Sequence, residues 1–173
     1  DGILLVIGDV AGKGLSAALL VSILIGAIRT LAEEMLAPEV LLFRLNEVLT
    51  GRTRGGFSTA LVAQIARDGA VTVANGGHLP PFLDGRELNI DGALPLGIVS
   101  GITYESSRFQ MAPGSRLTFC TDGVSEAQDK DGRLFGFERA QKMSTQSAVE
   151  IAEAARAHGQ QDDITVVTIE LIA

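Results

Sequence analysis

Four aspartates in three distant parts of the sequence adjoin runs of residues that favour β-strands: Asp9, Asp122 and the adjacent pair Asp162 and Asp163. The first two follow such a run, and the pair precedes one. An apolar strand holds its end rigidly, and short carboxylates at such ends can converge on a hard divalent cation. Aspartate also marks turns, so a turn is the alternative for any one position alone. Three positions together favour a metal site.

The segment 8–14, Gly-Asp-Val-Ala-Gly-Lys-Gly, contains a lysine between glycines, as phosphate-binding P-loops do. A P-loop has four residues between its glycines and a serine or threonine after the lysine. Here three residues lie between Gly8 and Gly12, and a glycine follows Lys13. The spacing argues against a nucleotide-binding switch, and protection by ATP against thermal unfolding would be needed to revive that hypothesis.

We interpret the same segment as a ligand loop. Asp9 supplies a carboxylate, the glycines let the backbone approach an ion closely, and the carbonyl oxygen of Val10 is a further hard ligand. Lys13 is a candidate phosphate partner, with a solvated residue at a helix start as the equal alternative. For the whole segment the alternative is a simple turn from a strand into a helix.

Asp122 follows a strand that ends at Thr121 and precedes Gly123, which allows a sharp exit. Glu126 is assigned to the surface or to a helix cap. Cys120 raises a thiol-phosphatase hypothesis, but that chemistry needs an arginine six positions after the cysteine, where this sequence has Glu126. Cys120 is therefore predicted to lie in the core.

Asp162 and Asp163 precede an apolar run, and adjacent side chains there point to opposite sides. We expect one carboxylate to face the ions and the other to bond backbone or water. The two histidines are too few and too far apart for a zinc site; we assign His78 to a structural turn and His158 to the surface. An all-oxygen aspartate cluster selects Mg²⁺ or Mn²⁺, and two such ions can activate water for in-line displacement at phosphorus.

The composition predicts one domain over residues 1–173, with 46% apolar and 20% charged residues. The net charge of −7 and the absence of a lysine–arginine cluster argue against a nucleic-acid surface. The single cysteine excludes an intramolecular disulfide and favours a cytoplasmic location. The most apolar stretch, 15–27, is expected to be too short to span a bilayer, and no signal peptide is expected before it. We therefore expect no membrane partner.

The patterning predicts a long helix over 15–36 and a second helix that begins at Pro38, because proline suits the first helical turn. Strands are expected at 57–66 and 70–74, joined by a hairpin. The remaining expected elements are strands at 82–83, 87–90 and 104–111, a strand ending at 121, helices at 137–143 and 148–157, and a strand at 164–171. Such segregated strands and helices indicate an α+β fold with helices outside antiparallel sheet.

Five motifs then occur in order, and together they resemble the SpoIIE-like branch of the metal-dependent protein phosphatase 2C (PPM) family. They are Gly-Asp-Val-Ala-Gly-Lys-Gly at 8–14 with Ala-Ala-Leu at 17–19, Asn-Gly-Gly-His-Leu-Pro-Pro at 75–81, Pro-Leu-Gly-Ile at 95–98, Thr-Asp-Gly-Val-Ser-Glu-Ala at 121–127, and Gln-Asp-Asp-Ile-Thr-Val-Val at 161–167. The similarity covers nearly the whole chain. Each motif is weak singly, but five in sequence are highly specific.

This resemblance implies a four-layer α/β/β/α sandwich, in which two stacked antiparallel sheets are flanked by helix pairs. It implies hydrolysis of phosphoserine or phosphothreonine on a protein by metal-bound water, without a phosphoenzyme. By motif match, Asp9 would bridge two Mg²⁺ or Mn²⁺ ions and the Val10 carbonyl would bind one. Asp122 and Asp162 would complete the catalytic cluster, with Asp163 in support.

The resemblance also implies partners. In such bacterial proteins the substrate is often a phosphorylated anti-anti-sigma factor, and the phosphatase domain often follows a sensor or receiver domain. The expected helix from Leu15 onward is where family members couple regulation to the metal loop. A homodimer is a further expectation.

One departure from the family is at the start of the chain. Asp1-Gly2 is a strong hairpin signal, but only the strand after it is in the sequence. The family has an upstream strand with a Gly-Gly-Asp-x-Tyr-Asp type motif that adds an acidic group to the site. We therefore expect an N-terminally truncated domain with weaker metal binding and low activity. The alternative function is a catalytically silent signalling domain that binds a partner.

Overall fold

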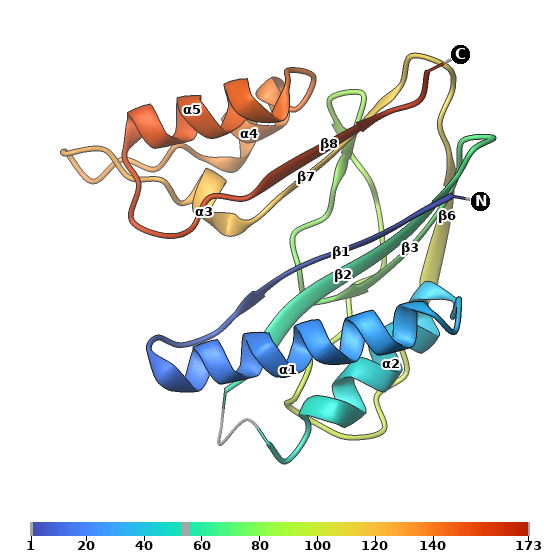
Figure 1. Cartoon of the computed structure of the whole chain (residues 1–173). Coiled ribbons are helices and arrows are strands. Elements are labelled where there is room, and N and C mark those ends of the chain that lie inside the picture. The colour runs from blue at the N-terminus through green and yellow to red at the C-terminus, as the bar shows by residue number, and fades with distance from the viewer. Residues whose placement is uncertain (1, 53–55, 173) are drawn as a thin grey trace. The chain divides into compact units, whose positions relative to one another are not determined.

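The computed structural model describes residues 2–52 and 56–172, and Asp1 with its hairpin signal lies outside them. The chain divides into two compact units (Figure 1). Unit 1 comprises residues 1–78 and 90–110, and unit 2 comprises residues 79–89 and 111–173. Each unit contains one four-stranded antiparallel sheet and its own helices. The expected α+β class is confirmed.

Sheet A belongs to unit 1 and has the strand order β1-β2-β3-β6. Its strands are β1 (Gly2–Val10), β2 (Ser58–Ala66), β3 (Ala70–Gly76) and β6 (Ser106–Gln110). The predicted β2–β3 hairpin is confirmed: Gly69 has a φ of 85°, and the amide of Ala70 donates to Asp68 Oδ1 over 3.0 Å. Such a turn needs a residue that tolerates positive φ.

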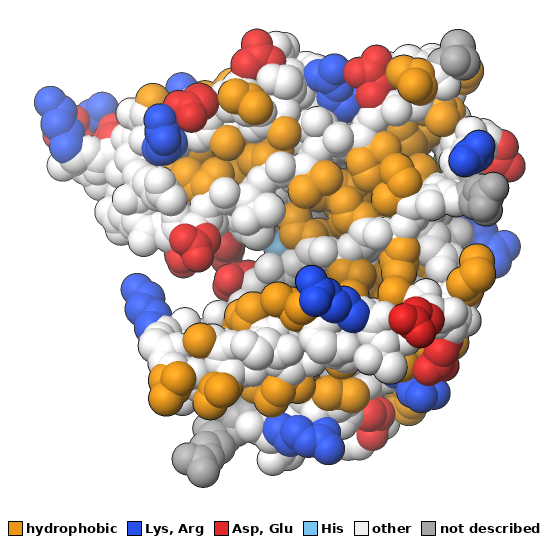
Figure 2. Space-filling model, in the orientation of Figure 1, with side chains coloured by type: hydrophobic (Ala, Val, Ile, Leu, Met, Phe, Trp, Pro, Cys, Tyr) orange, Lys and Arg blue, Asp and Glu red, His pale blue; other side chains and the backbone are white. Residues whose placement is uncertain are grey.

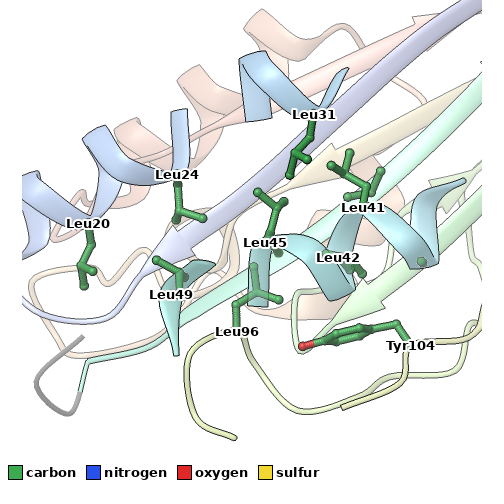
Figure 3. Packing of buried hydrophobic residues seen from close by; sticks show 12 residues of the cluster. Leu20, Leu24, Leu31, Leu41, Leu42, Leu45, Leu49, Leu96 and Tyr104 are labelled. Carbon is green, nitrogen blue, oxygen red and sulfur yellow. The ribbon is translucent and has the colours of Figure 1, made fainter. Parts of the chain in front are cut away.

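Two helices, α1 (Leu15–Ala32) and α2 (Pro38–Leu49), pack on sheet A through leucines at helical spacing. Figure 3 shows these leucines pointing toward one another. They are Leu20, Leu24 and Leu31 of α1, and Leu41, Leu42, Leu45 and Leu49 of α2, with Leu96 and Tyr104 beside them. Burial of each leucine contributes about 1.5–3 kcal/mol, so this cluster holds α1 and α2 against the sheet.

Helix α1 ends at Ala32, four residues before the predicted end at Leu36. A turn follows in which Met35 has a φ of 49°, outside the helical region. The helix has 18 residues with a mean hydropathy of 2.0, so by length and composition it could cross a membrane, contrary to the sequence-based expectation. This is weak evidence, because a core helix of a soluble protein passes the same test.

Sheet B belongs to unit 2 and has the order β5-β4-β7-β8. Its strands are β4 (Phe82–Leu83), β5 (Arg86–Glu87), β7 (Arg116–Cys120) and β8 (Val166–Glu170). The helices are α3 (Asp122–Ser125), α4 (Phe137–Met143) and α5 (Ala148–His158). Helix α5 begins with a capping box, in which Ser147 and Glu150 each bond the other's backbone amide.

The core of unit 2 lies between β7, α3, α4 and α5. Its buried members are Cys120, Val124, Ala127, Phe135, Ala140, Ile151 and Ala155. Cys120 is thus in the core, as predicted. The same contacts hold α3, which follows β7 directly and begins at Asp122.

The expected loop over 8–14 begins later than predicted, because β1 continues through Asp9 to Val10. Gly8 pairs with Ala60, Asp9 with Thr59 and Val10 with Ser58. A Cβ on Gly8 would overlap the carbonyl oxygen of Thr59. The glycine therefore allows two backbones to approach closely within the sheet, where the sequence suggested a turn.

Candidate metal site

Asp9 is held at the end of β1 by the start of β2. The amide of Asp9 donates to Thr59 Oγ1 over 3.2 Å, and Ser58 Oγ donates to the Asp9 carbonyl over 2.9 Å. The next residues stay attached, because the amide of Ala11 donates to the carbonyl of Phe57 over 2.9 Å. The Asp9 side chain is exposed and Val10 is half-buried. A rigid edge of sheet A therefore presents this carboxylate.

The loop that follows contains two glycines with positive φ, Gly12 at 115° and Gly14 at 77°. Gly14 is the N-cap residue of α1, and its carbonyl accepts from the amide of Ala18 over 3.1 Å. Lys13 between them is exposed. The glycines turn the chain from β1 into α1, and their positive φ angles give the loop its shape.

The second motif, at 75–81, forms a tight turn at the end of β3, and the side chain of His78 reaches Thr59, which pairs with Asp9. Asn75 accepts from the His78 amide over 2.8 Å and donates to the His78 carbonyl over 2.9 Å. The ring of His78 is buried, with Nδ1 at 3.0 Å from Thr59 Oγ1. Gly77 has a φ of 77°, and a Cβ there would overlap the ring of Pro95.

In unit 2 the fourth and fifth motifs, at 121–127 and 161–167, lie side by side. Thr121 donates its amide to the Thr165 carbonyl over 3.0 Å, and its Oγ1 accepts from the Thr165 amide over 3.0 Å. The same hydroxyl lies 3.2 Å from the Asp163 carbonyl oxygen. Asp122 is the next residue along and opens α3. The sequence therefore folds so that Asp122 and the Asp162–Asp163 pair belong to neighbouring segments of one unit.

Gly123 explains how closely these segments approach. A Cβ at this position would overlap the carbonyl oxygen of Asp163. Gly123 lies within α3 and does not have positive φ. The predicted role, a sharp exit from the strand, is therefore wrong, and the requirement is close backbone contact.

The carboxylates of unit 2 are accessible to solvent. Asp122 is half-buried, and Asp162 and Asp163 are exposed. The amide of Asp163 donates to Asp162 Oδ1 over 2.8 Å. None of the three takes part in the ion pairs seen within residues 2–52 and 56–172. Hard oxygen donors of this kind fit Mg²⁺ or Mn²⁺.

The predicted ligands come from both units. Asp9 and Val10 belong to unit 1, and the other three aspartates belong to unit 2. Over the described ranges, no three His, Cys, Asp or Glu side chains come together in a way that could hold a metal ion. The convergence of Asp9 with Asp122 and Asp162 stays a prediction.

The buried thiol of Cys120 stays protonated at neutral pH. Burial raises the pKa of its thiol from 9.0 to about 12. Because the thiolate is the nucleophile, a thiol with this pKa is inert. The thiol-phosphatase hypothesis is thereby excluded on physical grounds as well as on spacing.

The comparison with known sequences identifies the family. The protein-family model described as Stage II sporulation protein E (SpoIIE) matches residues 1–172 of this chain. The chain belongs to the SpoIIE family. The resemblance deduced from the five motifs is confirmed.

A curated relative is the phosphoserine phosphatase RsbU of Bacillus subtilis (strain 168), which is 30% identical over 141 residues. The match covers 78% of this chain and 42% of RsbU, so this chain spans less than half of that relative. What RsbU does as a whole protein is therefore carried to this SpoIIE-family chain only as a proposal.

Two solved structures show the fold. The structure of the RsbU and RsbW domains of Rv1364c from Mycobacterium tuberculosis matches with a TM-score of 0.80 at 24% identity, covering 98% of this chain and 52% of that one. The catalytic domain of the serine/threonine protein phosphatase PstP, in complex with two manganese ions, matches with a TM-score of 0.71 at 14% identity, covering 98% and 88%. Two antiparallel sheets with flanking helices match the PPM phosphatase fold.

Sequence reasoning missed Ser58 and Thr59, which hold Asp9. Both are polar residues at the start of a strand whose other residues, apart from Gln64, are apolar, and this contrast was the available signal. Their contact with Asp9 could not be predicted without knowing the register of β1 on β2, since a shift of one residue exchanges the two faces of a strand.

Proposed function

We propose that this SpoIIE-family domain hydrolyses phosphoserine or phosphothreonine on a bacterial regulatory protein, with water activated at a centre of two Mg²⁺ or Mn²⁺ ions. The family match over residues 1–172 carries the proposal. It is supported by carboxylates at the ends of rigid elements in both units, Asp9 in the last residues of β1 and Asp122 after β7.

In this proposal Asp9, Asp122 and Asp162 hold the ions, with the Val10 carbonyl as a further ligand and Asp163 in support. When bound, such ions supply a nucleophilic hydroxide and neutralise charge on the phosphoryl oxygens. The protein's part is positioning. The β1–β2 pairing orients Asp9, and the contacts of Thr121 with Asp163 and Thr165 fix the two acidic segments of unit 2.

We propose a phosphorylated anti-anti-sigma factor as the substrate class. Two relatives support this class by their names: RsbU is a phosphoserine phosphatase, and Rv1364c carries RsbU and RsbW domains. The exposed carboxylates suit a protein-bound phosphate, since a phosphoryl group on a folded partner can reach only an accessible site. A cytoplasmic location, an upstream sensor or receiver domain and a homodimer belong to the same proposal.

We further propose that a strand upstream of Asp1 completes the domain. Strand β1 is at one end of sheet A and pairs with β2 on its other side. An edge strand presents backbone groups that a further strand can pair with. On this proposal, the 173-residue segment binds Mn²⁺ more weakly than a chain extended at its N-terminus.

The test is Mn²⁺-stimulated hydrolysis of p-nitrophenyl phosphate by N-terminally extended chains carrying Asp9→Asn or Asp122→Asn. We expect each variant to lose more than about 100-fold in rate, because even the outer partners of a metal ligand are worth about 10- to 100-fold. Asp91→Asn is the matched control, since Asp91 is also exposed. Circular dichroism checks the fold. Wild-type rates in both variants would end the hypothesis.

The second candidate is a catalytically silent domain that binds a regulatory partner. Binding of an unphosphorylated partner with the same affinity with and without Mn²⁺, together with no phosphate release, would support this alternative.

A further inference from the structure

The hydroxyl of Thr59 connects two motifs that are distant in the sequence. Its oxygen accepts a hydrogen bond from the Asp9 amide at 3.2 Å and also lies 3.0 Å from Nδ1 of His78. All three residues belong to unit 1. The Asn-Gly-Gly-His turn is thereby joined to the end of β1 through a single side chain.

A backbone amide can only donate, so Thr59 Oγ1 must accept from Asp9. A hydroxyl has one proton and two acceptor lone pairs. The same oxygen therefore either donates to His78 Nδ1 or accepts a second hydrogen bond from it, according to the tautomer of the ring. In both cases the Thr59 hydroxyl is shared between the Asp9 amide and the His78 ring.

His78 is itself held from several sides. Its ring is only 7% exposed, and the side chain of Asn75 bonds both its amide and its carbonyl. The preceding Gly77 packs on Pro95, and the neighbouring Leu96 exchanges two backbone hydrogen bonds with Ser58 at 3.0 and 2.8 Å. The ring is thus fixed relative to the first residues of β2.

We propose that Thr59 and His78 are positioning residues for Asp9. His78 orients the Thr59 hydroxyl, and that hydroxyl fixes the backbone from which the Asp9 carboxylate and the Val10 carbonyl project. The inference deepens the proposed function and rests on it for the role of Asp9 as a metal ligand. Partners one step removed from a metal ligand commonly change metal affinity by about 10- to 100-fold.

The first test compares Thr59→Val with Thr59→Ser in the full natural protein. Valine keeps the branched shape without the hydroxyl, and serine keeps the hydroxyl. We expect Thr59→Val to weaken Mn²⁺ binding, measured by isothermal titration calorimetry, by about 10-fold, and Thr59→Ser to restore it to within about 2-fold of the wild type. Thr72→Val, at a half-buried position of β3, is the matched control.

The second test reads the connection in the metal-free protein. Thr59→Val should shift both the nitrogen-15 resonance of His78 Nδ1 and the backbone amide resonance of Asp9, because it removes the hydroxyl that both groups contact. An unchanged resonance at either group would overturn the inference. These readouts need no bound ion, so they decide on the connection even where Asp9→Asn shows that the proposed function is wrong.

A double-mutant cycle with Thr59→Val and His78→Phe completes the experiment. If both residues act through the same hydroxyl, the double variant should bind Mn²⁺ no more weakly than the weaker single variant. If the fold-losses in Mn²⁺ affinity of the two single variants multiply in the double variant, the two residues act independently, which would contradict the proposal. Urea unfolding of each metal-free variant separates a general loss of stability from a loss of metal affinity.

Discussion

At the scale of single residues, two glycines within helices differ in whether their surroundings leave space for a side chain. Gly123 lies in α3, where a Cβ would overlap the carbonyl oxygen of Asp163. Gly26 lies in the middle of α1, where a Cβ would meet nothing within 4 Å. Neither has positive φ, so the backbone conformation does not explain either one.

We predict opposite effects of alanine at these two positions. Gly123→Ala should lower the free energy of unfolding by about 1–3 kcal/mol, because the added methyl group pushes the two acidic segments of unit 2 apart. Gly26→Ala should raise it by about 0.5–1 kcal/mol, because alanine restricts the unfolded chain and suits a helix interior. Urea unfolding of both variants measures the difference. Equal effects of the two changes would contradict the overlap at Gly123.

The residues of the candidate site were predictable to different degrees. The acidic positions could be found because each adjoins a strand-like run. Asp122 does follow β7 closely, whereas Asp9 lies within the last residues of β1. The contacts of Thr59 and His78 could not be found, because they depend on the register of β1 on β2 and on the turn after β3. Such pairings join residues far apart in the sequence, and local patterns do not report them.

At the scale of elements, hydrophobic spacing predicted most helices and strands, and their ends were less certain. Helix α4 has the predicted bounds of 137–143, and α2 begins at Pro38 as expected. Helix α1 ends at Ala32, where its apolar run gives way to Glu33 and Glu34, and the chain then turns at Met35.

Helix α2 also holds the Pro-Leu-Gly-Ile segment in place, through the fully buried side chain of Asn46. This amide accepts from the Gly97 amide over 2.8 Å and donates to the Val99 carbonyl over 2.8 Å. The adjacent Glu47 accepts from the Ser100 hydroxyl and the Gly101 amide, and these hydrogen bonds lower the pKa of its carboxyl. The third motif, at 95–98, is therefore a docking segment for α2.

We predict that Asn46→Ala destabilises unit 1 by about 2–4 kcal/mol, because it leaves a buried amide and a carbonyl without partners. Limited proteolysis should cut residues 97–101 faster in this variant. Arg44→Ala, at an exposed position of the same helix, is the control and should behave as the wild type. Unchanged stability and protection in Asn46→Ala would show that the segment is held by other contacts.

At the scale of the whole molecule, unit 1 buries the hydroxyl of Tyr104 and unit 2 buries the thiol of Cys120. Burial favours the neutral, protonated form of both groups. Burial, with a smaller effect from Glu47, raises the pKa of Tyr104 in unit 1 from 10.0 to about 12. Burial raises the pKa of Cys120 in unit 2 from 9.0 to about 12. In alkali the unfolded chain loses these protons first, so rising pH favours unfolding.

We predict that the free energy of unfolding is steady below about pH 9 and falls as the pH rises toward about 12. Urea unfolding at a series of alkaline pH values measures the slope. The double variant Tyr104→Phe and Cys120→Ala should show a shallower slope than the wild type. An equal slope in both proteins would mean that other groups cause the alkaline loss.

The exposed side of α1 is the largest apolar feature of unit 1 that its own core does not use. Leu15, Leu19 and Ile25 are 76%, 55% and 46% exposed, and Figure 2 shows hydrophobic side chains along this helix. The hydroxyls of Ser22 and Thr30 bond carbonyls of the same helix, so they add little polarity. The helix that was expected to carry regulation is thus apolar on both sides.

Cys120 is the only cysteine of the chain, and its place in the core makes it a built-in reporter. A maleimide or iodoacetamide reagent can modify it only after the core of unit 2 opens. The rate of labelling therefore measures how often that unit opens under native conditions, without any engineered probe. Oxidants that inactivate thiol enzymes should leave Cys120 of the native protein unmodified, so no reducing agent is needed to protect its thiol.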